Sequence, residues 1–150
     1  MNMAEDLGAG LTGLELLRRL IAEGRRPPIA ETLDFTLVEV DEGRAVFEGV
    51  PGLRAYNPIG VVHGGYAATL LDSACGCAVH TRLSATQAYT TLELKVAYHK
   101  AMTIETGLVR AEGKVLSFGR RAAFSEAKLT DRSGRLLASA TSTLLVMERA

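Results

Sequence analysis

The feature that most constrains this 150-residue chain is a long apolar segment that carries a single carboxylate. Residues 57–80 read NPIGVVHGGYAATLLDSACGCAVH, and between Arg54 and Arg82 the only formally charged side chain is Asp72. The stretch from residue 64 to about 83 lacks proline and is rich in small residues, which favours a helix over a strand. A helix that is apolar on all sides is typically buried. Burying an unpaired carboxylate costs free energy, so Asp72 has either a specific partner or a chemical role.

The rest of the sequence predicts one shorter helix and a series of strands. Between residues 12 and 24, leucine and isoleucine recur at three- and four-residue spacings, which predicts an amphipathic helix with Thr12 as N-cap and Gly24 at its end. Proline and glycine predict a long loop over residues 51–62. Strands are expected over residues 33–40, 45–50, 91–98, 103–116, 119–130 and 136–147, with turn sequences DEGR at 41–44 and DRSG at 131–134.

The order of these elements predicts an α+β fold. A helix, two strands, the long buried helix and four strands follow one another, and nowhere do strand and helix alternate as in a parallel sheet. An antiparallel sheet wrapped around one central helix fits this order. The length predicts a single domain over residues 1–150, in which residues 1–26 form an N-terminal extension and helix. Within residues 91–98, the alternation predicts that Leu92, Leu94, Val96 and Tyr98 share one face of their strand.

Composition excludes several classes of function. A net charge of +0 with scattered lysine and arginine argues against a nucleic-acid partner. The first ten residues lack a secretion signal, and Asp72 interrupts the longest apolar stretch, so we expect no membrane span and a cytoplasmic location. Cys75 and Cys77 are expected as reduced core residues. His63 and His80 do not have the spacing of a standard metal site, so no metal is expected.

The pattern N-x5-H-G-G-x6-D runs from the loop into the long helix, through Asn57, His63, Gly64, Gly65 and Asp72. Together with the element order, this pattern resembles the hot-dog fold thioesterases, specifically the branch related to phenylacetate-degradation thioesterases. The resemblance implies a curved antiparallel sheet of about six strands around a long central helix. It also implies a homodimer, often paired into a homotetramer, and acyl-CoA as substrate without a further cofactor.

The resemblance also implies roles for individual residues. The helical carboxylate, Asp72, is the nucleophile or general base, and the Gly64 amide polarises the thioester carbonyl. A hydroxyl residue early in the next strand places the water or the acid. The candidate catalytic residues are therefore Asp72, Gly64, His63, Asn57 and Thr91, and the candidate substrate-binding residues are Gly65, Tyr66, Thr90, Arg120 and Arg121.

These residue types suit thioester chemistry, although each also has a structural reading. Attack on the carbonyl develops negative charge on oxygen, which N–H donors at the positive end of a helix stabilise. Glycine allows the substrate to approach the backbone closely, yet two glycines also simply turn a chain into a helix. Asp72 equally fits a buried bridge to a neighbouring element. Asn57 equally fits a turn residue, and His63 either donates to the carbonyl or orients the loop through the backbone.

Helix geometry adds a constraint that does not depend on any family. Asp72 lies nine residues after His63, which is roughly 13 Å along a helix at about 1.5 Å per residue. One thioester carbonyl cannot contact both His63 and Asp72 of the same chain. We therefore expect Asp72 to act on a carbonyl bound by a second copy of the chain, in a two-fold dimer with antiparallel helices.

The function expected from these residues is hydrolysis of an acyl-CoA. The resemblance implies an aromatic acyl group, such as phenylacetyl, and a medium-chain acyl group stays open as the alternative. The nucleotide phosphates of CoA would meet basic residues on the later strands, with Arg120 and Arg121 ranked first, although such residues are commonly solvated. Two alternatives remain open: a hot-dog hydratase or dehydratase, and a non-catalytic acyl-CoA binding module. The other basic candidates are Arg110, Lys114 and Lys128.

Overall fold

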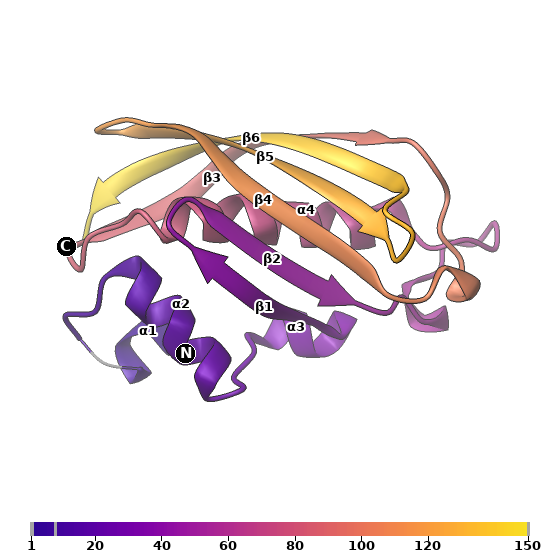
Figure 1. Cartoon of the computed structure of the whole chain (residues 1–150), viewed down its shortest axis with the longest axis horizontal. Coiled ribbons are helices and arrows are strands. Elements are labelled where there is room, and N and C mark those ends of the chain that lie inside the picture. Colours follow the sequence, from indigo (N-terminus) through magenta and orange to yellow (C-terminus); the bar gives the residue numbers. More distant parts are fainter. Residues whose placement is uncertain (1, 8, 150) are drawn as a thin grey trace.

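The computed structural model describes residues 2–7 and 9–149, which form a six-stranded sheet and the helices around it (Figure 1). The helices are α1 (Met3–Asp6), α2 (Gly13–Ala22), α3 (Pro28–Leu33) and α4 (Gly64–His80), with 3₁₀ turns η1 (Leu53–Ala55) and η2 (Ile104–Thr106). The strands are β1 (Phe35–Asp41), β2 (Arg44–Gly49), β3 (Gln87–Tyr98), β4 (Val109–Phe118), β5 (Ala122–Asp131) and β6 (Leu136–Glu148).

The sheet is antiparallel throughout and has the order β1-β2-β4-β5-β6-β3, so β1 and β3 are its two edges. The sheet curves, and α4 lies along its inner side in contact with β2 to β6 (Figure 1). This architecture confirms the predicted hot-dog fold. Because β3 pairs only with β6, the opposite side of this 12-residue strand has no partner strand in the described chain.

The core explains why α4 is apolar on nearly every side. Leu70, Leu71 and Ala74 have no exposed surface, and they belong to the core cluster that joins α4 to the sheet. The sheet approaches α4 closely at Gly113 of β4, where a Cβ atom would overlap the Ala74 carbonyl. A side chain at this position would push the sheet away from the helix.

The N-terminal helix α2 begins and ends close to the prediction. Thr12 and Glu15 form a capping box, in which the Thr12 amide donates to the Glu15 carboxylate over 2.8 Å. The buried side chains of Leu16 and Leu17 pack in a cluster that includes Val40 of β1 and Ala78 of α4. The N-terminal extension therefore covers the C-terminal part of the central helix.

β3 begins at Gln87, four residues before its predicted start, and two other predicted strands begin at helical segments. Leu33 ends a helix instead of beginning a strand, because Pro28 at the first turn starts α3 and Asp34 then adopts the left-handed conformation with φ 56°. Residues 103–108 are not a strand either, since Thr103 caps η2 and β4 begins only at Val109. Both errors concern segments too short to show helical periodicity.

A β-bulge in β3 overturns the predicted alternation of residues 91–98. The pairing of β3 with β6 shifts between Thr91 and Glu93, so Leu92 is an extra residue and its side chain is 60% exposed. Leu94 and Val96 still pack against the core. Because the bulge changes the parity of the strand, Thr91 faces α4 together with these two residues.

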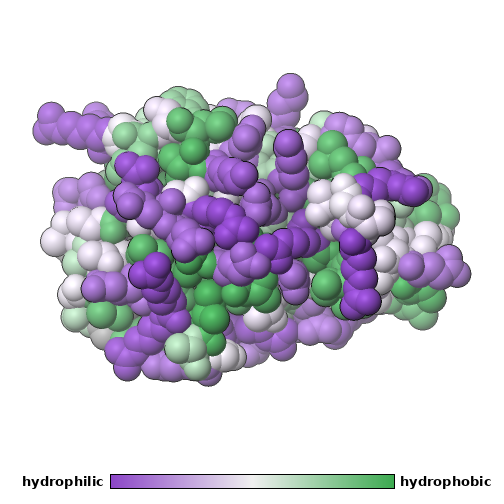
Figure 2. Space-filling model, viewed as in Figure 1, coloured by the Kyte–Doolittle hydropathy of each residue, from purple (hydrophilic) through white to green (hydrophobic). Residues whose placement is uncertain are grey.

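The outer face of β1, β2 and β4 carries a network of ion pairs. Arg110 donates to Glu39 over 2.6 Å and to Glu48 over 2.9 Å, while Arg44 bridges Glu39 and Glu112. The hydrogen bond from Arg110 contributes most to holding the pKa of Glu39 below its usual value. Hydrophilic side chains accordingly dominate the centre of this face in Figure 2.

None of the described helices is both long and apolar enough to cross a membrane.

Candidate active site

The N-terminus of α4 presents one free backbone donor. His63 is the N-cap, and its Nδ1 accepts a hydrogen bond from the Gly65 amide over 2.8 Å. The Gly64 amide has no acceptor among the described residues, so it is the available N–H at the positive end of the helix. Since Nδ1 accepts, a neutral His63 carries its proton on Nε2, where it is a second donor.

Tyr98 holds the same turn from β3. Its hydroxyl donates to the Gly64 carbonyl over 2.8 Å, so the peptide between Gly64 and Gly65 is fixed by Tyr98 at its oxygen and by His63 at its nitrogen. A Cβ atom at Gly64 would lie 2.9 Å from Tyr98 Cζ. Glycine thus allows the tyrosine ring to pack directly on the start of α4.

Asn57 organises the loop that leads into this turn. Its Oδ1 accepts from the amides of Ile59, over 3.1 Å, and Val61, over 3.3 Å. The amide of His63 then donates to the Ala55 carbonyl over 2.7 Å. In the structure Asn57 therefore acts on the loop backbone, as the turn-residue reading describes.

Asp72 and Thr91 form the second part of the site. Thr91 Oγ1 donates to Asp72 Oδ1 over 3.1 Å, and both side chains are half-buried. Thr90 is exposed and points to the other face of β3, so the structure does not bring it to Asp72. Asp72 lies eight residues after Gly64 on one helix, a separation of about 12 Å.

Two grooves meet at the His63–Gly65 turn. The first, here called the α3-side groove, has a volume of about 380 Å³ and includes Leu33, Tyr56 and Tyr66 in its lining. The second, the β3-side groove, has a volume of about 440 Å³ and runs from Gly64 past Tyr98 to Lys100. Both volumes lie within the range of small-molecule sites.

Tyr66 contributes its ring to this site and keeps its hydroxyl in the core. Only 3% of the residue is exposed, and its hydroxyl lies against Gly49 without a hydrogen-bond partner in the described residues. Burial raises its pKa to about 12, so Tyr66 is a neutral phenol at physiological pH.

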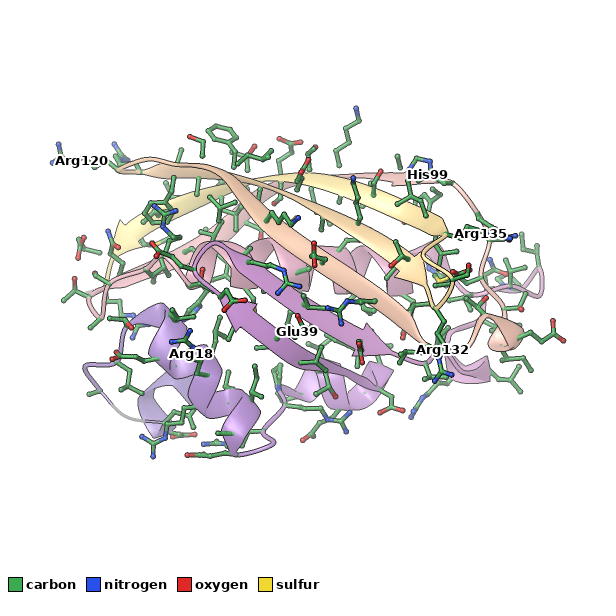
Figure 3. All side chains as sticks on the ribbon, viewed as in Figure 1. Arg18, Glu39, His99, Arg120, Arg132 and Arg135 are labelled. Atoms are coloured by element: carbon green, nitrogen blue, oxygen red, sulfur yellow. The ribbon has the colours of Figure 1, made fainter. Side chains whose placement is uncertain are left out.

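The predicted phosphate ligands lie apart from the Gly64 turn of their own chain. Arg120 and Arg121 are exposed on the turn between β4 and β5 and line a hollow of about 400 Å³. Figure 3 shows Arg120 and His99 at opposite ends of the molecule. Arg110 and Lys114 are engaged by carboxylates, with Lys114 3.1 Å from Glu112.

The remaining reactive side chains of α4 are buried in neutral form. Burial raises the pKa of Cys75 to about 11 and that of Cys77 to about 12, so neither is a thiolate nucleophile at neutral pH. Burial lowers the pKa of His80 to about 4, and its Nε2 has no partner among the described residues. No three His, Cys, Asp or Glu side chains in the described chain are grouped as a metal site requires.

Sequence reasoning missed Tyr98 and the β3-side groove. The alternation of residues 91–98 did place Tyr98 on the face of Leu94 and Val96, but nothing in the sequence aligned the end of that strand with Gly64. A contact between residues 34 positions apart depends on how β3 crosses α4.

Comparison with known proteins decides the family. Residues 59–138, which include the start of α4, Asp72 and Thr91, match the model of the thioesterase superfamily. This protein belongs to the thioesterase superfamily. It is a thioester hydrolase of the hot-dog fold, as predicted.

The relatives agree with this family. A 1,4-dihydroxy-2-naphthoyl-CoA hydrolase from Listeria monocytogenes serotype 1/2a (strain 10403S) is 26% identical over 121 residues, which cover 81% of this chain and 97% of that enzyme. A conserved protein from Pseudomonas aeruginosa has a TM-score of 0.76 at 27% identity, covering 83% of this chain and 98% of its own. A phenylacetic acid degradation-related protein from Ralstonia eutropha JMP134 has a TM-score of 0.76 at 26% identity, covering 86% of this chain and 98% of its own.

Proposed function

We propose that this thioesterase hydrolyses acyl-CoA, with Asp72 of one subunit acting on a carbonyl bound at the Gly64 amide of a second subunit. The observation that carries this proposal is the division of the site along α4. The free Gly64 amide and Asp72, which accepts a hydrogen bond from Thr91 of β3, lie about 12 Å apart on one rigid helix. They can therefore act on the same carbonyl only if they come from two different chains. The name of the Listeria relative, a CoA thioester hydrolase, supports acyl-CoA as the substrate class.

In the proposed reaction, the carbonyl oxygen accepts a hydrogen bond from the Gly64 amide, and the protonated Nε2 of a neutral His63 is a second donor. These donors stabilise the oxyanion of the tetrahedral intermediate. The hydrogen bond from Thr91 occupies Oδ1 of Asp72 and leaves Oδ2 for a water molecule. Asp72 takes a proton from that water as its oxygen attacks the carbonyl carbon. Alternatively, its carboxylate attacks directly and forms a mixed anhydride, which water hydrolyses after CoA has left. The carbon–sulfur bond then breaks, and the CoA thiolate takes up a proton.

The surface of α4 supports an antiparallel helix pair. Its accessible side carries small residues at helical spacing around Asp72, so a second backbone can come close. These small residues are Gly65, Ala68, Thr69 and Ser73.

The free edge of β3 lies next to that side. A two-fold axis that brings Asp72 to the partner's Gly64 passes near the middle of their helical separation. Thr91 contacts Asp72, and Tyr98 contacts Gly64. The same axis therefore passes the free edge of β3 at a point between Thr91 and Tyr98. We therefore propose a homodimer in which both the helices and the β3 edges pair. Association into a homotetramer, as the family resemblance implies, stays a prediction.

The α3-side groove suits the acyl group. Tyr56, Tyr66 and Leu33 give it aromatic and apolar walls, and its lining includes His63 and Gly65, the two neighbours of Gly64. Aromatic rings pack favourably against such walls, which favours an aromatic acyl group over a medium alkyl chain. The naphthoyl group in the name of the Listeria relative and the phenylacetic acid link of the Ralstonia protein are consistent with this choice. Membership of the branch related to phenylacetate-degradation thioesterases is therefore also part of this proposal.

A panel of acyl-CoAs tests the function. We expect release of free thiol from phenylacetyl-CoA and 1,4-dihydroxy-2-naphthoyl-CoA, and slower release from octanoyl-CoA. Asp72→Asn should lower kcat by about 10²- to 10⁴-fold, the usual contribution of a general base. Unchanged hydrolysis by Asp72→Asn contradicts the catalytic role. Binding without turnover favours the binding module, and formation of a hydrated or dehydrated acyl-CoA favours the hydratase alternative.

A further inference from the structure

The β3-side groove leads from the Gly64 amide to Lys100, and a second basic residue, Arg135, lies at the same end of the molecule. Gly64 and Gly65 line its inner end, and Lys100 contributes to its outer end. The amides of His99 and Lys100 both donate to the Leu137 carbonyl, over 2.9 and 3.0 Å. This pairing sets the chain just after β3 beside the start of β6, where Arg135 precedes the strand. Figure 3 shows His99 and Arg135 at the same end of the molecule.

The charges of Lys100 and Arg135 are not neutralised within the described chain. Neither has a carboxylate within 4.0 Å among residues 2–7 and 9–149, whereas Arg44 and Arg110 are both engaged in ion pairs. The adjacent carboxylate, Asp131, pairs with neither side chain, and its Oδ1 accepts from Ser133 N, Ser133 Oγ and Arg135 N. Two cations therefore remain free to bind an anion: Lys100 in the lining of this groove and Arg135 at the same end of the molecule.

The other groove offers no comparable site. Arg54, a cation in the lining of the α3-side groove, lies 3.7 Å from Asp34, and Leu33, Tyr56 and Tyr66 share that lining. A thioester has two arms that meet at its carbonyl, and the two grooves meet at the Gly64 turn. The apolar groove fits the acyl arm. The groove that ends at free cations fits the CoA arm, which carries phosphates.

We infer that Lys100 and Arg135 bind the phosphates of the CoA nucleotide after the pantetheine arm has passed along the β3-side groove. This inference rests on the proposed function, since it takes the thioester carbonyl to lie at Gly64. Charged hydrogen bonds to phosphate oxygens are among the stronger polar contacts, and arginine forms them in pairs. The site lies at the opposite end of the molecule from Arg120 (Figure 3).

The test compares two substrates that differ only in the nucleotide. The double variant Lys100→Ala/Arg135→Ala should raise KM for the acyl-CoA by about 10- to 100-fold, as expected for losing hydrogen bonds to a charged group. KM for the matching acyl-pantetheine, which has no nucleotide, should stay within about twofold, and kcat should change little for either substrate. Arg18→Ala/Arg19→Ala on the exposed face of α2 removes the same charge and serves as the matched control.

Calorimetry with free CoA gives a second readout that does not need turnover. The wild type should bind CoA more tightly than pantetheine, and Lys100→Ala/Arg135→Ala should remove that difference. An equal rise of KM for both substrates, or CoA binding unaffected by the double variant, overturns the inference. A selective loss in Arg120→Ala/Arg121→Ala instead also overturns it and assigns the nucleotide to the turn between β4 and β5. Failure of the wild type to hydrolyse either substrate contradicts the proposed function, while the calorimetry still decides the phosphate site.

Discussion

Replacing Gly64 with proline removes the proposed oxyanion donor and little else. Gly64 is the first residue of α4, and its amide donates to no acceptor in the described chain, so losing that N–H breaks no hydrogen bond. Proline is favoured at the first position of a helix. His63 has φ −60° and ψ 137°, the extended backbone that a residue before proline adopts.

The expected effect on catalysis is large and the effect on stability is small. Loss of one oxyanion donor lowers kcat by about 10²- to 10³-fold. Proline also restricts the unfolded chain, which is worth about 0.4–1 kcal/mol in favour of the folded state where the backbone fits. Both Gly64→Pro and Gly64→Ala add a Cβ 2.9 Å from Tyr98 Cζ, so the tyrosine ring must shift in both. Gly64→Ala keeps the N–H and is therefore the matched control.

The assay is thiol release from acyl-CoA together with thermal unfolding of both variants. We expect Gly64→Pro to be at least about tenfold slower than Gly64→Ala, with melting temperatures within about 4 °C, the shift that 1 kcal/mol produces in a domain of this size. Equal rates in the two folded variants would refute the reasoning, because the amide would then contribute nothing to the transition state. A loss of activity accompanied by unfolding of Gly64→Pro alone would show that the N–H has a structural acceptor.

Two further predictions concern the subunit interface and pH. Mixing inactive Asp72→Asn with inactive Gly64→Pro and allowing the subunits to reassort should restore activity to about a quarter of the wild-type sites. Half of the dimers are then mixed, and each mixed dimer holds one intact site out of two. No recovery of activity would show that each chain uses its own Asp72. Burial holds the pKa of His80 at about 4, so the unfolded state binds a proton between about pH 6.5 and pH 4 that the folded state does not, and stability should fall by about 3 kcal/mol across that range. Chemical denaturation at several pH values should show this slope and a weaker one in His80→Phe.

The fold was largely predictable because its strongest signals are long. The apolar helix around Asp72 and the order of strands before and after it determine the layer arrangement, and both extend over many residues. The errors fall where local backbone geometry decides the structure. Pro28 begins a helix of one and a half turns, and Thr103 caps a single 3₁₀ turn, neither of which leaves a periodic pattern.

The site was predictable only where one segment contains it. His63, Gly64 and Asp72 lie on a single loop and helix, so their spacing could be measured from the sequence. Thr91 faces Asp72 only because Leu92 is bulged out of the strand, and strict alternation would have predicted the opposite face. The contacts of Tyr98 depend on the crossing of strand and helix, which no local pattern records.

In the proposed dimer, the bulge at Leu92 links the proposed catalytic residues to assembly. Beyond the bulge, β3 directs Tyr98 to Gly64, and before it the same strand directs Thr91 to Asp72. In the proposed dimer, the free edge of this strand also meets its counterpart. The strand that aligns both parts of the site within a chain therefore also sets the distance between those parts across two chains. It follows that a change on the outer side of β3, without any contact to substrate, can lower kcat by shifting Asp72 away from the partner's amide.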